Sequence, residues 1–176
     1  EMPSPPLGLA YVAGAFERAG AEVQVLDLVV ESYHKRKLER LLATFQPDLV
    51  GATCVTMSFD AAMDVLNDVK ALRPEVTTLL GGPHISYRAG ETLEECPALD
   101  VAVLGEGETT VAELMAAFSK NGLDADLSGI AGLAFRQGSS VWITAPRPHL
   151  LDVNGLAPPA RKLLPMGRYR ALGLAV

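Results

Sequence analysis

The chain has 176 residues, a formal net charge of −6 at pH 7 and 49% hydrophobic residues. This length and composition predict one domain with a sizeable core. The negative charge argues against nonspecific nucleic-acid binding, which requires a basic face. No apolar run reaches the ~18 to 20 residues of a membrane span, and no charged leader precedes a hydrophobic stretch. We therefore expect a cytoplasmic protein whose two cysteines, Cys54 and Cys96, are free thiols.

Helix-like and strand-like segments alternate over the first 120 residues. Apolar residues at helical spacing predict helices, and short apolar runs next to glycine or proline predict strands. The predicted helices are 7–19, 35–45, 59–72, 91–96 and 108–120, and the predicted strands are 23–27, 49–53, 76–80 and 101–104. This order predicts an α/β fold with a Rossmann-like, doubly wound parallel sheet and helices on both faces.

The two ends of the chain differ from this rhythm. Residues 133–136 and 141–144 flank a Gln-Gly-Ser-Ser turn, which predicts a β-hairpin over 133–144. The proline-rich stretch that follows predicts an extended linker over 145–176. At the start, Pro5-Pro6 leads straight into a helix-like segment, although a doubly wound domain normally opens on a strand. We therefore expect a first strand upstream of residue 1.

Two loops, 50–58 and 79–84, each follow a predicted buried strand and precede a helix-like segment. In a parallel α/β sheet, loops at the carboxyl ends of strands are where ligands bind. The first loop has small and hydroxyl residues, and the second has the pair Gly81-Gly82. Together they predict a narrow slot with exposed backbone amides, which suits a flat ligand with a thin tail. The alternative is that the glycine pair only serves a tight turn.

A third loop, Gly105-Glu106-Gly107-Glu108, resembles a dinucleotide loop only superficially. It lacks the third glycine, and its glutamates would repel a pyrophosphate. Two interpretations stay open. Either Glu106 or Glu108 caps the following helix, where the helix dipole favours an anion, or the loop forms a wall of the slot.

Single residues near these loops allow several roles. His84 could ligate a metal, donate to a ligand amide or serve the local structure, but no second histidine or cysteine stands at ligand spacing. Cys54 is expected to be buried as a small apolar residue. Met57 either covers the face of a macrocycle or packs. His34 and His149 are expected at the surface.

Four stretches, taken in order, resemble the cobalamin-binding domain found in front of radical SAM enzymes. They are Pro-Pro-Leu-Gly-Leu-Ala-Tyr at 5–11, Pro-Asp-Leu-Val-Gly at 47–51, Leu-Gly-Gly-Pro-His at 80–84 and Gly-Glu-Gly-Glu at 105–108. Residues 163–169 are similar to the linker before the catalytic barrel. The resemblance implies a cobalamin-binding domain over 1–144 and a linker over 145–176 towards a radical SAM catalytic domain in the same polypeptide.

The resemblance also implies which residues meet the cofactor. In cobalamin-dependent methionine synthase and the mutases, a Ser-x-Leu loop and a Gly-Gly loop line the slot for the nucleotide tail. Thr53-x-Val55 and Gly81-Gly82 occupy those places here. The implied cofactor-binding residues are Leu7, Gly8, Tyr11, Thr53, Val55, Thr56, Met57, Ser58, Gly81, Gly82, Pro83, His84, Gly105, Glu106 and Gly107.

Two departures refine these expectations. The Asp-x-His-x-x-Gly motif, whose histidine ligates cobalt, is absent, which implies base-off cobalamin without a histidine ligand and with Leu7, Tyr11 or Met57 nearest its lower face. The Cys-x-x-x-Cys-x-x-Cys pattern of a radical SAM cluster is also absent. The iron–sulfur cluster and S-adenosylmethionine would therefore belong to the separate barrel, and this chain alone should have no catalytic residue, metal ligand or turnover.

The predicted function is the cobalamin-carrying module of a methyltransferase or cyclase that acts on a small molecule or a peptide. One alternative is a domain that keeps the fold without cofactor and acts as a structural or docking module. Another is a flavodoxin-like binder of a nucleotide or flavin.

Overall fold

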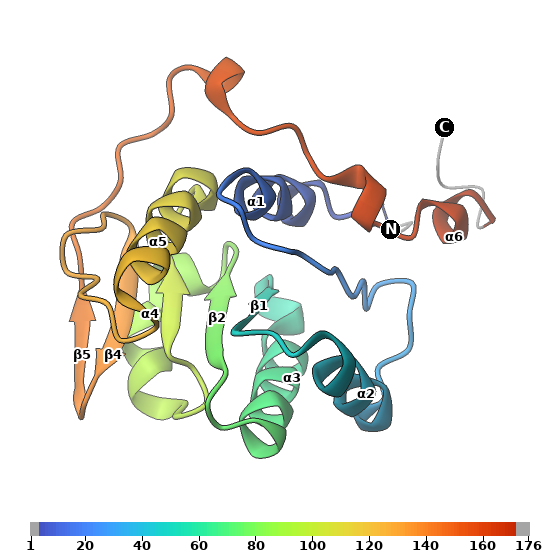
Figure 1. The fold of residues 1–176 in the computed structure, drawn as a ribbon, viewed down its shortest axis with the longest axis horizontal. Helices are drawn as coiled ribbons and strands as arrows, with labels where there is room; N and C mark the ends of the chain where they lie inside the picture. The colour runs from blue at the N-terminus through green and yellow to red at the C-terminus, as the bar shows by residue number, and fades with distance from the viewer. Residues whose placement is uncertain (1–3, 172–176) are drawn as a thin grey trace.

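The computed structural model describes residues 4–171, and its centre is one five-stranded sheet (Figure 1). The strands are β1 Leu49–Thr53, β2 Thr77–Gly81, β3 Val101–Val103, β4 Leu133–Gln137 and β5 Ser140–Ile143, and they lie in this order across the sheet. The first three are parallel, and the β4–β5 hairpin joins β3 in antiparallel pairing. The predicted Rossmann-like α/β fold with a hairpin over 133–144 is therefore confirmed.

Helices cover both faces of the sheet (Figure 1). On one face lie α1 (Leu7–Arg18) and α5 (Gly107–Asn121), and on the other lie α3 (Phe59–Leu72) and α4 (Ile85–Glu95). Beside them, α2 (Lys35–Phe45) packs its Leu38 and Leu42 against Val69 of α3. This double cover explains why the central parallel strand β3, Val-Ala-Val, is apolar and buried throughout.

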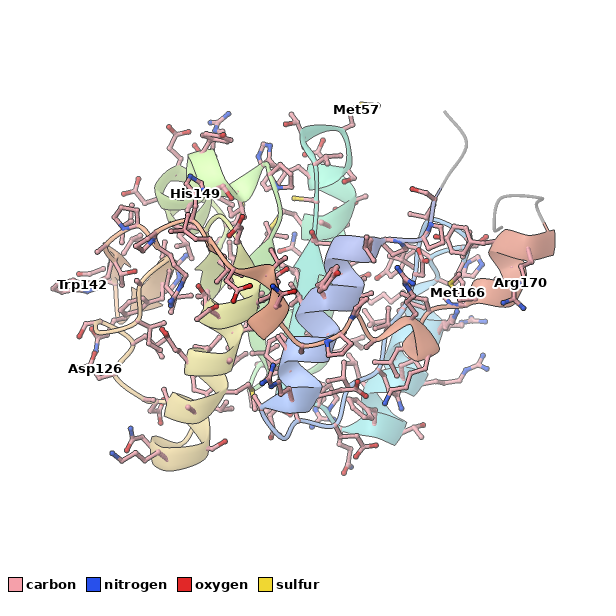
Figure 2. The ribbon with its side chains drawn as sticks, turned by 90° about the horizontal axis from the view of Figure 1, so that it is seen from above. Met57, Asp126, Trp142, His149, Met166 and Arg170 are labelled. Atoms are coloured by element: carbon pink, nitrogen blue, oxygen red, sulfur yellow. The ribbon has the colours of Figure 1, made fainter. Side chains whose placement is uncertain are left out.

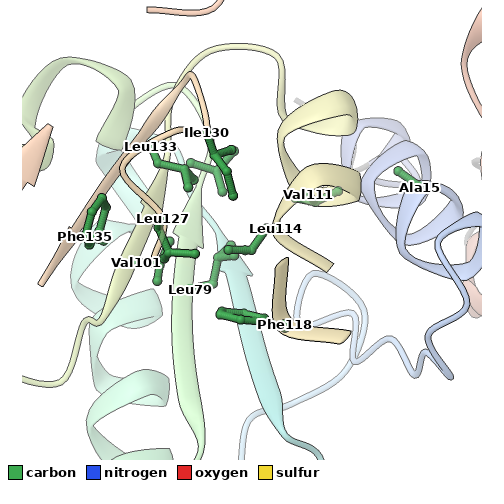
Figure 3. Packing of buried hydrophobic residues seen from close by; sticks show 11 residues of the cluster. Ala15, Leu79, Val101, Val111, Leu114, Phe118, Leu127, Ile130, Leu133 and Phe135 are labelled. Carbon is green, nitrogen blue, oxygen red and sulfur yellow. The ribbon is translucent and has the colours of Figure 1, made fainter. Parts of the chain in front are cut away.

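The core divides into two layers because successive side chains of a strand point to opposite faces. Leu79, Val101 and Leu133 pack towards Leu114 and Phe118 of α5 (Figure 3). The residues next in sequence, Leu80, Ala102 and Ala134, join the layer under α3 and α4. The sheet is thus held rigidly between two helical layers, and its loops are fixed at their bases.

The predicted strand over 23–27 is wrong. This segment belongs to no strand, although it is a short, mostly apolar run, Val-Gln-Val-Leu-Asp. A strand needs a neighbour for its backbone groups, and among residues 4–171 no strand pairs with this segment. Within residues 4–171, β1 is an edge strand, and β2 is the one strand with which it pairs.

The fourth helix begins earlier than its sequence pattern predicts. It starts at Ile85, whereas the pattern predicts only 91–96. A kink at Arg88, with φ −130° and ψ 21°, interrupts the helix. Its buried residues Ile85, Ala89, Thr92 and Leu93 keep helical spacing across the kink, but only two of the first six residues, Ile85 and Ala89, are buried, so the first turns give a weak pattern.

Residues 145–171, which we call the strap, are more ordered than the extended linker expected there. The strap contains the short helices η2 (Val153–Gly155), η3 (Arg161–Leu163) and α6 (Met166–Ala171). It crosses α1, where Ala160 N donates to Ala10 O at 2.8 Å. A side chain at Gly14 would collide with the carbonyl oxygen of Pro158, so this glycine allows the close approach. The rest of the predicted linker, 172–176, lies outside the described residues, and its role as a linker stays a prediction.

Across residues 4–171, no helix has both the length and the apolar character that crossing a membrane requires.

Candidate functional site

The first two loops meet at the carboxyl edge of the sheet. Thr53, the last residue of β1, is in register with Gly81, the last residue of β2. Beyond the strands, Cys54 N donates to Gly81 O at 3.1 Å. The loops predicted to form one slot therefore start side by side.

The two glycines of the second loop have different surroundings. Gly82 has a φ of +102°, and a Cβ atom there would collide with the carbonyl oxygen of Cys54 and lie 2.8 Å from Thr53 Oγ1. A Cβ atom at Gly81 would meet nothing within 4 Å. Gly82 thus allows the two loops to pack together, whereas Gly81 leaves open space beside them.

His84 links the second loop to the first. Its ring stacks on Phe59, with ring centroids 4.3 Å apart and an interplanar angle of 29°. Its Nδ1 lies 3.2 Å from Thr56 Oγ1, within hydrogen-bond distance. The imidazole therefore helps to fix the Thr56 hydroxyl. Phe59 lies far from His84 in the sequence, and no local pattern predicted the stack.

Ser86 joins the second loop to the third. Its hydroxyl donates to Gly82 O at 3.1 Å and accepts from Gly105 N at 3.0 Å. No sequence pattern indicates this role, because a lone serine in a helical turn gives no signal for a bridging residue. Through Ser86 the three loops form one continuous surface.

The start of α1 reaches the same surface. Val12 Cγ2 lies 3.6 Å from the Cβ position of Gly107, the first residue of α5. The preceding turns of α1 carry Leu7, Gly8 and Tyr11, of which the first two are exposed and the third is half-buried. All the predicted segments thus gather at one edge of the sheet.

Neither Ser58 nor Glu106 caps the helix that follows it. Ser58 stands at the N-cap of α3, but its Oγ accepts from Val55 N and donates to Val55 O, each at 3.2 Å. Glu106 stands at the N-cap of α5 and makes no capping bond. Its Oε2 accepts from Leu150 N of the strap at 3.1 Å. Of the two interpretations of the third loop, the structure therefore disfavours capping by Glu106.

Met57 and Val55 project from the first loop. Met57 is 99% exposed and points outward at the rim of the molecule (Figure 2). Val55 and Pro83 are exposed as well. Packing by Met57, one of its two expected roles, is not seen. Such side chains at the tip of a loop are available to contact an apolar ligand surface.

The thiol below the loops is unsuited to nucleophilic chemistry. Cys54 is buried, as expected, and burial raises the pKa of its thiol. A thiol in this state is protonated near neutral pH and is a poor nucleophile. Both cysteines are free in the structure.

Residues 4–171 contain no group of three or more His, Cys, Asp or Glu residues that could hold a metal ion.

This surface fits a cofactor with a corrin ring and a nucleotide tail. A Cβ atom at Gly8, Gly81 or Gly105 would meet nothing within 4 Å, so backbone is open to a ligand in each segment. Thr53 and Thr56 are exposed and offer hydroxyl groups. The start of α1 offers no imidazole, in contrast to a site that ligates cobalt through histidine.

A family model described as the B12 binding domain matches residues 1–115, which include α1 and all three loops. The chain belongs to the B12 binding domain family. The resemblance identified in the sequence is therefore confirmed. The roles of the individual site residues stay predictions, since the match concerns the domain and not its contacts.

The chain is similar to parts of larger proteins. It is 36% identical over 170 residues to an uncharacterized methyltransferase, PH0819, from Pyrococcus horikoshii, covering 97% of this chain and 36% of that protein. It is 32% identical over 155 residues to the anaerobic magnesium-protoporphyrin IX monomethyl ester cyclase of Cereibacter sphaeroides, covering 88% of this chain and 25% of the cyclase. The chain thus spans between a quarter and about a third of the length of these two relatives.

Its fold is also that of a solved structure. The cobalamin-dependent S-adenosylmethionine radical enzyme OxsB, with aqua-cobalamin and S-adenosylmethionine bound, superposes with a TM-score of 0.76 at 17% identity. The match covers 97% of this chain and 23% of OxsB. At this identity the likeness shows the fold, which agrees with the doubly wound sheet described above.

Proposed function

We propose that this chain holds base-off cobalamin at the carboxyl edge of its sheet, without a histidine ligand to cobalt. The observation that carries the proposal is the family match over residues 1–115, which spans the three loops that meet at this edge. The nucleotide tail would enter beside Gly81, where the backbone faces open space. Thr53 and Thr56 would donate hydrogen bonds to the tail, and the start of α1 would face the lower side of the ring.

In the whole protein, the upper face of the cofactor would meet a radical SAM catalytic domain of the same polypeptide. That domain would hold the iron–sulfur cluster and S-adenosylmethionine. The similarity to a methyltransferase and to a cyclase supports this arrangement. When bound, cobalamin supplies cobalt chemistry for methyl transfer or ring formation, and this chain binds and orients the cofactor. The substrate, a small molecule or a peptide, would be selected by the catalytic domain.

The test is to incubate the protein with hydroxocobalamin, remove free cofactor by gel filtration and record the visible spectrum. We expect cobalamin to elute with the protein. Gly81→Leu should lower the affinity at least about tenfold, equivalent to ~1.4 kcal/mol, because its side chain fills the slot. The matched control is Ala71→Leu, which places the same leucine side chain at an exposed position near the end of α3, away from the loops.

The coordination of cobalt is tested separately by electron paramagnetic resonance of the bound cob(II)alamin. Without an axial nitrogen ligand, the cobalt signals should lack splitting by nitrogen. Such splitting would contradict the base-off, histidine-free arrangement. A folded protein that elutes colourless would contradict cofactor binding and favour the docking-module alternative.

A further inference from the structure

A small cavity of about 120 Å³ lies between the strap and the start of α5. Its walls are Glu106, Glu108 and Thr109 from the start of α5 and Arg147, Leu150 and Val153 from the strap. The cavity borders the third loop of the cofactor surface, and none of its strap residues was singled out by the sequence analysis. Its size suits a side group of a ligand and is too small for a whole corrin ring.

Hydrogen bonds from Arg147 hold this part of the strap in place. The Arg147 guanidinium donates from Nε to Thr110 Oγ1 at 2.8 Å, from Nη2 to Ala131 O at 3.0 Å, and from both Nη atoms to Glu113. Leu150 N donates to Glu106 Oε2 at 3.1 Å. The cavity wall is therefore fixed by bonds to α5 and to the segment before β4.

The charge of the cavity selects the kind of group that can enter. The positive charge of Arg147 is already matched by the Glu113 carboxylate. Glu106 and Glu108 therefore leave a negative surplus, which would repel a phosphate or a carboxylate. Their oxygens accept hydrogen bonds, and the Thr109 hydroxyl can donate one. A neutral group that both donates and accepts matches this lining, and a primary carboxamide is such a group.

We propose that this cavity takes one peripheral carboxamide arm of the corrin ring. The inference rests on the proposed function. Cobalamin carries primary amides on short methylene arms around its ring. The amide NH2 would donate to Glu106 or Glu108, and its carbonyl would accept from Thr109. Leu150 and Val153 would contact the methylene groups of the arm. The neighbouring Leu151 is 99% exposed and is available to contact the edge of the ring.

The test uses cobalamin derivatives in which hydrolysis has turned one peripheral amide into a carboxylate. Positional isomers differ only in which arm is changed. We expect one isomer to bind at least about tenfold more weakly than cobalamin, because its carboxylate meets Glu106 and Glu108 at close range. Glu108→Gln should restore most of this loss for that isomer. Glu94→Gln, an equal charge change at an exposed position of α4, should not.

The outcomes separate this inference from the proposed function. If cobalamin binds and every isomer binds within about twofold of it, the cavity takes no amide arm, and the proposed function stands. If Glu94→Gln restores binding as well as Glu108→Gln does, the loss reflects overall charge, and the inference is overturned. If cobalamin itself does not bind, both proposals fail.

Discussion

Gly81 and Gly82 are neighbours, yet a side chain would meet different surroundings at each. At Gly82 it would collide with the backbone of Cys54, and φ is +102°. At Gly81 it would point into open space. The sequence predicted that the pair matters, but two identical residues give no indication of which one serves the turn and which one faces a ligand. That distinction depends on contacts with β1, far away in the sequence.

Gly82→Ala is expected to lower the free energy of unfolding by more than ~2 kcal/mol, because it combines an unfavourable φ with a backbone collision. The matched control is Gly105→Ala. Gly105 also has a positive φ, +69°, but its Cβ position is open. The control should cost about 1 kcal/mol. Urea denaturation followed by circular dichroism measures both, and equal losses would show that the collision is relieved by a small backbone shift.

The strap is the element whose attachment sequence reasoning could not foresee. The Tyr169 hydroxyl donates to Asp27 Oδ2 at 2.6 Å, and both residues are buried. Asp27 Oδ1 accepts from Val29 N at 3.1 Å. Arg168 Nη1 adds a bond to Val30 O at 3.0 Å. These bonds join α6 to the turn at 27–31.

Tyr169→Phe should lower the free energy of unfolding by ~1–3 kcal/mol, because Asp27 Oδ2 then lacks its buried donor. Burial raises the pKa of Tyr169 above its ordinary value of 10.0. The folded protein therefore holds this proton more tightly than the unfolded chain does. The stabilisation is fully present below about pH 10 and is lost as pH rises above it. Urea denaturation between pH 8 and about pH 11 should show this decline in the wild type.

The decline should be smaller in Tyr169→Phe, and what remains comes from Tyr33, whose pKa is also raised by burial and by its hydrogen bond to Asp68. Tyr87→Phe is the control, since Tyr87 is almost fully exposed on α4. It should leave both the stability and the alkaline decline unchanged. An identical decline in all three proteins would assign it to other groups.

Elements with local patterns were predicted well, and elements that depend on distant partners were not. The regular apolar spacing of α1, α2, α3 and α5 and the short apolar runs of the sheet are local properties, and all were predicted within a few residues. Residues 23–27 form a short, mostly apolar run but have no strand beside them in the described chain. The strap has no periodic pattern at all. Its order comes from contacts such as Tyr169 with Asp27.

At the scale of the whole molecule, the edge strand β1 bears on whether the protein self-associates. Asp48 O and Cys54 N bond towards β2. Because backbone groups alternate along a parallel strand, the N–H and C=O of Gly51 point to the opposite, unpaired side. An unpaired strand edge favours pairing with another chain. We expect this polypeptide to self-associate as its concentration rises.

Gly51→Pro should reduce this association, because proline removes the N–H group at the open side and is tolerated at strand edges. Gly51→Ala keeps the N–H group and should associate like the wild type. Light scattering after gel filtration gives the mass of each. Association that persists unchanged in Gly51→Pro would point to another surface, such as the exposed β5 with Trp142 and Ile143.

The contact between Asp27 and Tyr169 joins residues 142 positions apart, and this separation affects the order in which the chain folds during synthesis. A ribosome adds about 5–20 residues per second, so roughly 7 to 28 seconds separate the synthesis of these two partners. Local helices and short loops form in microseconds. The sheet and its helices can therefore assemble while the strap is still being made. During that interval the third loop lacks its contact with Leu150, and the cavity beside it has only one wall. A cofactor that arrives early would meet an open face, and the strap would close over its edge only after Tyr169 has been made.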